Sequence, residues 1–480
     1  MQIEEFKQLL QFIKETKAES TTLEIKKALK GAPEKIYDTL SAFSNTKGGV
    51  IVYGIDESAD FAFTGVYDLN DLQRKVSEQC LQMQPEIHAI FTPIEHEGKK
   101  FLAVEIPECE QNQKPCFYKG KGRLGGSYLR IGDQDVLMSE YEIYSIEAFR
   151  NKTHDELRTL ESAVEKPIDS LKQQEFLIKI KKNRPNLENL NDKEVFELNG
   201  LTKGGIPTLL NVLMFSLYPQ GILPNLSIVA VVVPGTAMGQ SDEMGLRFTA
   251  NKRIEGTLTE IIDGAVDFAL KNMSVKTVVN PATGKRNDVT EYPIIAVREA
   301  ILNAVIHRDY SFYTENQPIT LYFYKDRLEI TNPGGLYGRL SVDDLGKTMP
   351  DTRNPNIAKM MELYGYTENR YSGIPTMRKE LQYAGLPDPV FENYKGTFKV
   401  VFYNSKKKIA LKPEEIPPFL LNFCKTPRSI AEITETLDIK TAKYLKTEYL
   451  APLIEKGKIK LTMPNKPRSK FQKYVTVHYI

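Results

Sequence analysis

The segment REAILNAVIHRDY, residues 298–310, combines an acid, an amide and a histidine at a spacing that could support chemistry. Glu299, Asn303 and His307 follow one another at intervals of four residues, so a helix would present all three side chains on one face. A carboxylate can orient or deprotonate a water molecule, and an amide oxygen can bind Mg²⁺ beside nucleotide phosphates. The segment therefore predicts a site for phosphoryl chemistry, and the solvated face of a packed helix is the alternative.

Two glycine-containing segments later in the chain favour the site over the solvated face. The segment EITNPGGL places Asn332, Gly334 and Gly335 after a strand-like run, and glycine lets the backbone approach a ligand closely. The segment YSGIPTM contributes Gly373. A metal cluster is not expected here, because no other histidine or cysteine stands in a ligand pattern with His307, which we expect to anchor the end of the helix.

A second group of carboxylates lies near the N-terminus. Glu19 and Glu24 are five residues apart, Lys26 follows in an alternating run, and Asp56 ends the apolar segment VIVYGID. Three carboxylates brought together by a sheet could hold Mg²⁺ or Mn²⁺ for phosphodiester cleavage, with Lys26 neutralising the developing charge. The alternative is that these acids are solvated turn or capping residues.

Basic residues are concentrated at the C-terminal end. The chain has a formal charge of +2, but residues 405–480 contain 16 Lys and Arg against 7 Asp and Glu, which is +9 and leaves −7 for the rest. The helical segments and the final strand pair predict a winged helix. Its expected nucleic-acid contacts are Lys440, Lys443, Lys446, Lys466, Arg468 and Lys470. A protein-binding module with a solvated basic face is the alternative.

The composition excludes several other classes of protein. The four cysteines form no CxxC pair, so neither a disulfide framework nor a zinc site is indicated. The longest apolar run, LSIVAVVVPG, has the length of a strand, so we expect a soluble cytoplasmic protein without a membrane contact. No GxxxxGK[ST] loop is present, and helicase activity is therefore not expected.

At 480 residues the chain should fold as several domains, and its elements predict an α+β multidomain protein. A helix at 34–44, a glycine turn and strands up to GSYLRIGDQD form the first unit. A helix, a hairpin at ITLYFYKDRLEITNPGGL, two further helices and a last strand form the unit that contains the first site. The expected domains are 1–140, a helical and α/β connector at 141–279, an α/β sandwich at 280–404 and a winged helix at 405–480.

The motifs REAILNAVIHRDY, NPGGL, RNPNIAKMM and ENRYSGIPTMRKEL resemble the divergent GHKL-type ATPase domain of helicase-like and transcriptional-regulator-like bacterial proteins. The resemblance implies ATP and Mg²⁺ as ligands, with Glu299 activating water and Asn303 holding Mg²⁺. It also implies that Asn332 approaches the adenine. The pocket would be shaped by Gly334, Gly335 and Gly373.

Two departures from that family pattern alter the expected activity. Asn332 stands where an aspartate commonly accepts from the adenine amino group, and an amide can either accept or donate. Tyr371 stands where a glycine would help to form the phosphate lid. We therefore expect nucleotide binding in preference to hydrolysis, and enzyme activity stays open.

The N-terminal segments ESTTLEIK, SAFSNTKGGVIVYGID and KPCFYKGKG followed by GSYLRIG resemble the Schlafen-type AlbA-like domain. Members of that family bind nucleic acid, and some are endoribonucleases that use acids corresponding to Glu19, Glu24 and Asp56. Arg130 in YLRIG would contact phosphate or form a structural salt bridge.

Together these features predict a bacterial ATP-binding regulatory protein in which nucleotide binding modulates contact with DNA. RNA is a second candidate partner, and a homo-oligomer is a candidate assembly. The alternative function is a metal-dependent Schlafen-like nuclease that acts in defence and is regulated by nucleotide. A third hypothesis is a transcription regulator that neither hydrolyses ATP nor cleaves nucleic acid, and such a regulator would bind DNA in a salt-sensitive manner.

Overall fold

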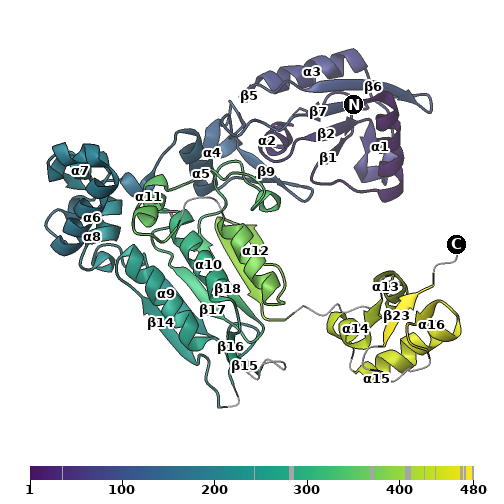
Figure 1. Ribbon diagram of the computed structural model, residues 1–480. Helices are drawn as coiled ribbons and strands as arrows, with labels where there is room; N and C mark the ends of the chain where they lie inside the picture. Colours follow the sequence, from purple (N-terminus) through teal and green to yellow (C-terminus); the bar gives the residue numbers. More distant parts are fainter. Residues whose placement is uncertain are drawn as a thin grey trace.

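The computed structural model consists of an N-terminal, a central and a C-terminal region, each with sheets of its own (Figure 1). The structure describes residues 1–34, 36–242, 244–279, 286–367, 372–405, 412–425, 427–437, 439, 441–464, 469 and 472–477. Helices and strands alternate in all three regions, so the predicted α+β multidomain class is confirmed. Among the described helices, none has the length and apolar character needed to cross a membrane.

The N-terminal domain is built on a four-stranded sheet covered by helices on both faces. In spatial order its strands are β1 (Leu23–Lys26), β2 (Gly49–Tyr53), β7 (Lys99–Ile106) and β6 (Ile90–His96). The covering helices are α1 (Ile3–Thr16), α2 (Tyr37–Asn45) and α3 (Leu69–Leu81). Side chains alternate along β2, so Ile51 and Tyr53 pack with α2 and α3 whereas Val52 packs with α1.

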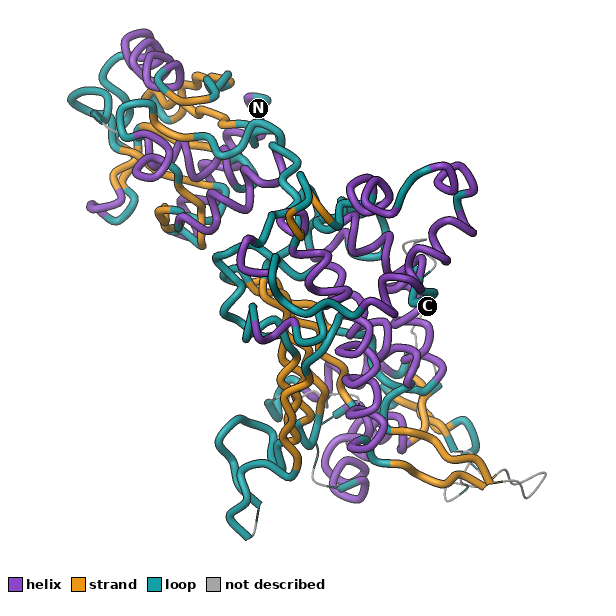
Figure 2. Tube along the Cα trace, turned by 90° about the vertical axis from the view of Figure 1, so that its left-hand side faces the viewer, coloured by secondary structure: helices purple, strands orange, loops and turns teal. Residues whose placement is uncertain are grey.

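Smaller pairs of strands complete this domain. They are β3 (Ile55–Asp56) with β4 (Ala62–Phe63), β5 (Met83–Gln84) with β8 (Phe117–Tyr118), and β9 (Tyr128–Ile131) with β10 (Gln134–Leu137). A short helix α4 (Gly122–Gly126) precedes β9, and α5 (Glu140–Arg150) leads out of the domain. Ser139 begins α5 with a capping box to Glu142, which fixes the start of the helix. Figure 2 shows the domain that contains the N-terminus beside the central body and joined to it by a narrow connection.

The central region is a six-stranded mixed sheet with helices on one face. Its strands in order are β14 (Ala250–Ile254), β13 (Ile228–Val232), β17 (Ile319–Phe323), β18 (Arg327–Pro333), β20 (Thr397–Tyr403) and β19 (Val390–Tyr394). The helices are α9 (Leu258–Asn272), α10 (Ile294–His307) and α12 (Gly373–Tyr383), with α11 (Pro355–Leu363) at the end of α10. Because β13 pairs in parallel with β17, the sheet combines strands that precede residue 279 in the sequence with strands that follow it.

The predicted division between a connector and an ATP domain at residue 279 is therefore wrong. One continuous hydrophobic core contains residues from Phe176, in the predicted connector, to Phe402, in the predicted ATP domain. The elements expected in the connector are α6 (Ser170–Asn183), α7 (Asp192–Leu198), β11 (Thr202–Lys203), β12 (Ile206–Pro207) and α8 (Leu209–Phe215). The hairpin of β15 (Val275–Val279) and β16 (Arg286–Thr290) follows α9. Sequence pattern identified β13 as a buried strand but not its partner, because pairing across 91 residues, from 228 to 319, leaves no local signal.

The C-terminal region has a core of its own that includes Leu420, Leu445 and Tyr474. Its elements are α13 (Ile416–Phe423), β21 (Arg428–Ser429), α14 (Ile430–Thr436), α15 (Ala442–Tyr444), a π-helical segment Leu445–Leu450, α16 (Ala451–Glu455), β22 (Ile459–Leu461) and β23 (Lys473–Thr476). The three strands form one antiparallel sheet in the order β21-β23-β22. The winged-helix assignment of this region stays a prediction.

Candidate functional site

Helix α10 positions the residues from which the first predicted site begins. Its apolar face, including Val297, Ile301 and Val305, is buried in the central core, so the remaining face is free for the site. Glu299 and Asn303 lie beside Gly373 at the start of α12. A methyl group on Gly373 would come within 2.8 Å of Asn303 Nδ2 and 2.9 Å of Glu299 Oε2. The predicted grouping of these residues is thus present, and the close approach explains why position 373 carries no side chain.

An inner cavity opens between α10, α12 and the sheet. It offers about 150 Å³ to the centres of water-sized molecules and is partly open to solvent. Its walls are mostly apolar and include Ile330, Met377, Phe391, Phe398 and Val400. Such a lining suits the two faces of a planar heteroaromatic ring.

Asn332 is a buried polar residue in the lining of this inner cavity. It lies near the end of β18 and is only 3 % exposed, and its Oδ1 has no hydrogen-bond partner among the described residues. An unpaired buried carbonyl oxygen is costly, so an amide in this position is suited to accept a hydrogen bond from a ligand. The predicted approach of Asn332 to the base is therefore compatible with the geometry.

An outer, more polar cavity adjoins the inner one along α10. Its polar walls include Arg298, Glu299, Thr352, Tyr366 and Ser372. Burial raises the pKa of Glu299 above its ordinary value, although the neighbouring Arg298 opposes the shift. Of the described part of the chain, three residues line both cavities, namely Asn303, His307 and Gly373.

The glycine turn after β18 closes one side of the inner cavity. Gly334 has φ +100°, and a methyl group there would lie 2.5 Å from Asp309 Cβ, so only glycine fits. Arg353 Nη2 donates to the Gly335 carbonyl oxygen over 3.0 Å and thereby holds the turn in place. Gly335 itself lies close to Asn393, because a methyl group there would meet Asn393 Oδ1 at 2.8 Å. Gly334 and Gly335 thus shape the cavity wall as predicted.

The turn also connects the cavity to α5, the helix that leaves the N-terminal domain. Tyr141 Oη donates to Asp309 Oδ2 over 2.7 Å, and Arg353 Nη1 lies 3.4 Å from the same carboxylate oxygen. Burial opposes ionisation of Asp309, but Arg353 and the hydrogen bonds from Ser311 and Tyr141 outweigh it and lower its pKa.

Aromatic packing continues the connection along α5. Phe149 packs edge-on against Tyr337, a residue of the inner cavity, with ring centroids 5.4 Å apart. At the other side of α5, Glu147 pairs with Arg123 of α4, so α5 contacts both the N-terminal domain and the cavity wall.

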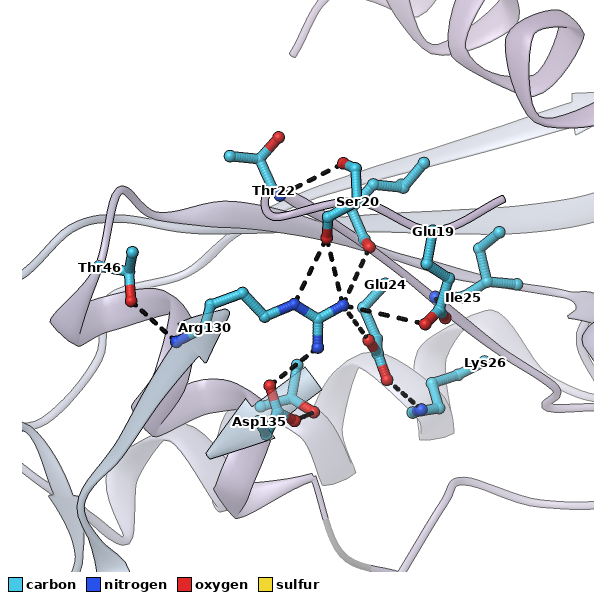
Figure 3. Close-up of polar contacts among 11 residues, drawn as sticks. Glu19, Ser20, Thr22, Glu24, Ile25, Lys26, Thr46, Arg130 and Asp135 are labelled. Atoms are coloured by element: carbon cyan, nitrogen blue, oxygen red, sulfur yellow. Dashed lines mark hydrogen bonds and ion pairs between the residues drawn. The ribbon is translucent and has the colours of Figure 1, made fainter. Parts of the chain in front are cut away.

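Three acids, Glu19, Glu24 and Asp135, surround the buried Arg130, as Figure 3 shows. The Arg130 side chain is 1 % exposed; Nη2 donates to Glu24 Oε2 over 2.7 Å and Nη1 to Asp135 Oδ1 over 2.8 Å. Lys26 pairs with the other oxygen of Glu24. Of the two roles expected for Arg130, the geometry fits the structural salt bridge, because the guanidinium is already fully engaged inside the domain.

Glu19 and Asp56 do not complete a metal site with Glu24. Glu19 Oε1 accepts from the backbone amide of Ile25 over 2.7 Å, and burial, with a smaller contribution from Glu24, raises its pKa to about 7. Asp56 instead pairs with Lys27 and accepts from Ser58. Within the described residues no three His, Cys, Asp or Glu side chains are arranged to hold a metal ion. The predicted three-carboxylate site is therefore not formed, because cations of the protein itself pair with Glu24 and Asp56.

Two family models match the regions described above. Residues 19–139 match a model described as "Schlafen, AlbA_2", and residues 316–402 match HATPase_c_4, described as "Putative ATP-dependent DNA helicase recG C-terminal". The chain thus combines one region similar to Schlafen AlbA_2 domains with another similar to HATPase_c_4 domains. Both resemblances expected from the sequence are thus confirmed. The HATPase_c_4 match begins after α10 and does not include Glu299 or Asn303. The placement of these two residues in the candidate site is therefore supported by the geometry and not by the match.

Residues 419–476 match a third model, "Filamentation induced by cAMP protein Fic-like, C-terminal domain". No curated protein matches the chain. A crystal structure of the DIP2311 protein from Corynebacterium diphtheriae is 16 % identical, with 90 % of this chain and 87 % of that chain covered and a TM-score of 0.41. The solution structure of the N-terminal domain of a RecG-related protein from Nitrosomonas europaea is 25 % identical, covers 28 % of this chain and 94 % of that chain, and has a TM-score of 0.23.

Some predicted residues cannot be placed, and some structural ones were not predicted. Tyr371 lies outside the described residues, as do Lys440, Lys466, Arg468 and Lys470. Lys443 in α15 and Lys446 in the π-helical segment are both exposed. The sequence analysis missed Tyr141 and Arg353, which contact the cavity turn from distant segments.

His307 is the last residue of α10 and also lines both cavities, and its role as an anchor of the helix end stays a prediction. Its spacing of four residues from Asn303 was the signal that could have indicated this position.

Proposed function

We propose that the chain is an ATP-binding regulatory protein in which nucleotide binding changes its contact with DNA. The observation that carries the proposal is the unpaired Oδ1 of Asn332 in an apolar cavity that continues, past Asn303, into a polar one. A nucleotide changes in character in the same order along its length, from a flat and largely apolar base at one end to charged phosphates at the other. The two matched domain types, of which one model's description mentions an ATP-dependent DNA helicase, support the same choice of ligand.

Each end of the nucleotide has a group suited to receive it. Asn332 would accept from an amino group of the base, and Asn303 would contribute an amide oxygen to Mg²⁺, which neutralises phosphate charge when it is bound. Glu299 stands one helical turn before Asn303, and the raised pKa of its carboxyl suits it to take a proton from water. Hydrolysis, if it occurs, would use Glu299 as the base.

The contacts of α5 support a coupling between nucleotide and nucleic acid. Tyr141 and Phe149 touch the wall of the inner cavity, and Glu147 on the same helix pairs with Arg123 of the N-terminal domain. A ligand that moves the turn at Gly334 would therefore move α5 and the domain attached to it. We also propose that the C-terminal region contacts DNA as a winged helix, through exposed lysines such as Lys443 and Lys446.

The decisive experiment measures binding of ATP with Mg²⁺ by calorimetry, and DNA affinity with and without that nucleotide. Asn303→Ala should weaken nucleotide binding by at least tenfold and remove the response of DNA affinity to ATP. Asn70→Ala, an exposed asparagine on α3, is the matched control and should leave both unchanged. If Asn303→Ala binds nucleotide as tightly as the parent protein and its DNA affinity still responds, the proposed function is wrong.

A further inference from the structure

The point where the two cavities meet has a defined chemistry. Among the residues that the structure describes, Asn303, His307 and Gly373 are the ones that line both cavities. Since the base of a nucleotide is joined to its phosphates through the sugar, a nucleotide whose base fills the inner cavity and whose phosphates fill the outer one places its sugar beside these residues. This step rests on the proposed function.

His307 is the residue of this group that is free to bind the sugar. Glycine has no side chain, and Asn303 is the residue assigned to the phosphate end. The imidazole of His307 has no hydrogen-bond or ion-pair partner in the part of the chain that the structure describes. The ring lines both cavities, so it is not confined to contacts within its own helix. Its polar atoms are therefore available to a ligand.

The protonation state of His307 matches the chemistry of a hydroxyl group. Burial, together with the nearby positive charge of Arg353, lowers the pKa of His307 to about 4. At neutral pH the ring is uncharged, so one nitrogen accepts a hydrogen bond and the other donates one. A neutral donor and acceptor suits a sugar hydroxyl, which itself both donates and accepts, better than it suits a phosphate.

We propose that His307 binds a ribose hydroxyl of the nucleotide and makes the site selective for ribonucleotides over deoxyribonucleotides. The ligand class is then a ribonucleoside triphosphate rather than any nucleoside triphosphate. In the absence of the hydroxyl, the imidazole is left without a partner in a cavity that the base and sugar have closed to water. A site built to bind a polar group rejects the analogue that lacks it, and we expect a discrimination of roughly tenfold or more.

The test compares the binding of ATP, 2′-deoxy-ATP and 3′-deoxy-ATP to the full chain by calorimetry with Mg²⁺. The parent protein should bind ATP roughly tenfold more tightly than at least one deoxy analogue, and the analogue that is rejected identifies the hydroxyl. His307→Phe retains the ring without its nitrogens and should bind ATP and both analogues within about twofold of one another. His88→Phe, at an exposed histidine of the N-terminal domain, should keep the parent ratio.

Three results overturn the inference, and one of them also overturns the function. If the parent binds ATP and both analogues equally, His307 does not bind a sugar hydroxyl, although the nucleotide site stands. If His307→Phe keeps the parent discrimination, another group recognises the sugar. If the parent binds none of the three nucleotides, both the proposed function and this inference fail. The comparison within the parent protein needs no variant, so it holds even if a substitution at position 307 prevents folding.

Discussion

The hydroxyl of Tyr141 donates a hydrogen bond of 2.7 Å to the carboxylate of Asp309, and so joins the helix that leaves the N-terminal domain to the second residue after α10. Tyr141 and Asp309 are separated by 168 residues of sequence. Asp309 also lies against the Gly334 turn, whose neighbours line the inner cavity. This polar contact thus connects α5, the helix that directly follows the region matching Schlafen AlbA_2, with the wall of the candidate nucleotide site.

Replacing Tyr141 by Phe should uncouple the two regions while leaving the cavity intact. The substitution removes one hydrogen bond, which costs about 1 kcal/mol of stability, and leaves the ring in place. We expect ATP affinity to change by less than about threefold and the response of DNA affinity to ATP to fall by at least half. Both are measured by titration of labelled DNA, with Tyr383→Phe at an exposed position as the control. An unchanged response to ATP would show that the coupling does not pass through Tyr141.

Replacing Gly373 by Ala should weaken the binding of ATP with Mg²⁺. The new methyl group would lie within 3 Å of both Asn303 and Glu299, so at least one of these side chains must move from its position. Position 373 has no left-handed backbone requirement, and the fold should therefore be retained. We expect a loss of roughly tenfold in affinity, which is about 1.4 kcal/mol. Gly31→Ala, where a methyl group meets open space, should have no effect.

Replacing Arg130 by Leu should destabilise the N-terminal domain strongly. Glu24 and Asp135 would lose their buried partner, and breaking such a pair costs about 3–5 kcal/mol. Arg74→Leu, which removes an exposed arginine that pairs with Asp71 and Glu78, should cost less than about 1 kcal/mol. Urea unfolding of the full chain measures both.

Millimolar Mn²⁺ should leave the stability of the parent unchanged, because Arg130 and Lys26 already neutralise Glu24. A stabilisation by Mn²⁺ that disappears in Glu24→Gln would restore the nuclease hypothesis.

Replacing Glu19 by Gln should remove a specific pH dependence of stability. The carboxyl has a pKa of about 7 in the folded protein against 4.5 in the unfolded chain. Between these values the unfolded chain releases a proton that the folded protein retains, so stability is fully present below about pH 4.5 and falls as the pH rises to 7. The variant should match the parent at low pH and exceed it by about 2 kcal/mol near pH 8. Equal stabilities near pH 8 would show that Glu19 is solvated.

Replacing Lys443 and Lys446 together by Ala should weaken DNA binding in a manner that depends on salt. Each phosphate contact contributes about 0.9 to the slope of log affinity against log salt, so the slope should decrease by about 2. Lys193 and Lys203 are also exposed but lie outside the C-terminal region, and their joint replacement by Ala is the control. If both double variants change the slope equally, the C-terminal region is not the specific contact.

Local sequence pattern predicted the elements of this protein well and their long-range pairing poorly. The four-residue spacing from Glu299 to His307 identified α10, and the strand-like runs identified β17 and β18 as a hairpin, because both signals lie within a few residues. The pairing of β13 with β17 and the ion pair of Arg130 with Glu24 join residues about 90 to 106 positions apart. No periodicity encodes such contacts, so they could not be derived.

The two candidate sites also differ in how far the sequence predicted them. Asn303, Asn332 and Gly373 come from three segments, but each segment carries its own motif, and the cavity brings them together as expected. The N-terminal acids looked like a metal site because carboxylates are visible in a sequence while their partners are not. Lys27 and Arg130 pair with Asp56 and Glu24 in the folded protein, but nothing in the sequence around these two basic residues indicates the pairing.

The sheet that runs through residue 279 also limits how this protein can be divided between genes. A segment beginning at residue 280 would carry α10 and the glycine turn but not β13 and β14, and would expose the edge of β17 to other chains. Recombination that transfers the nucleotide site to another protein must therefore carry the preceding strands as well. The segment that must be transferred as a whole therefore begins well before the sequence motifs of the nucleotide site.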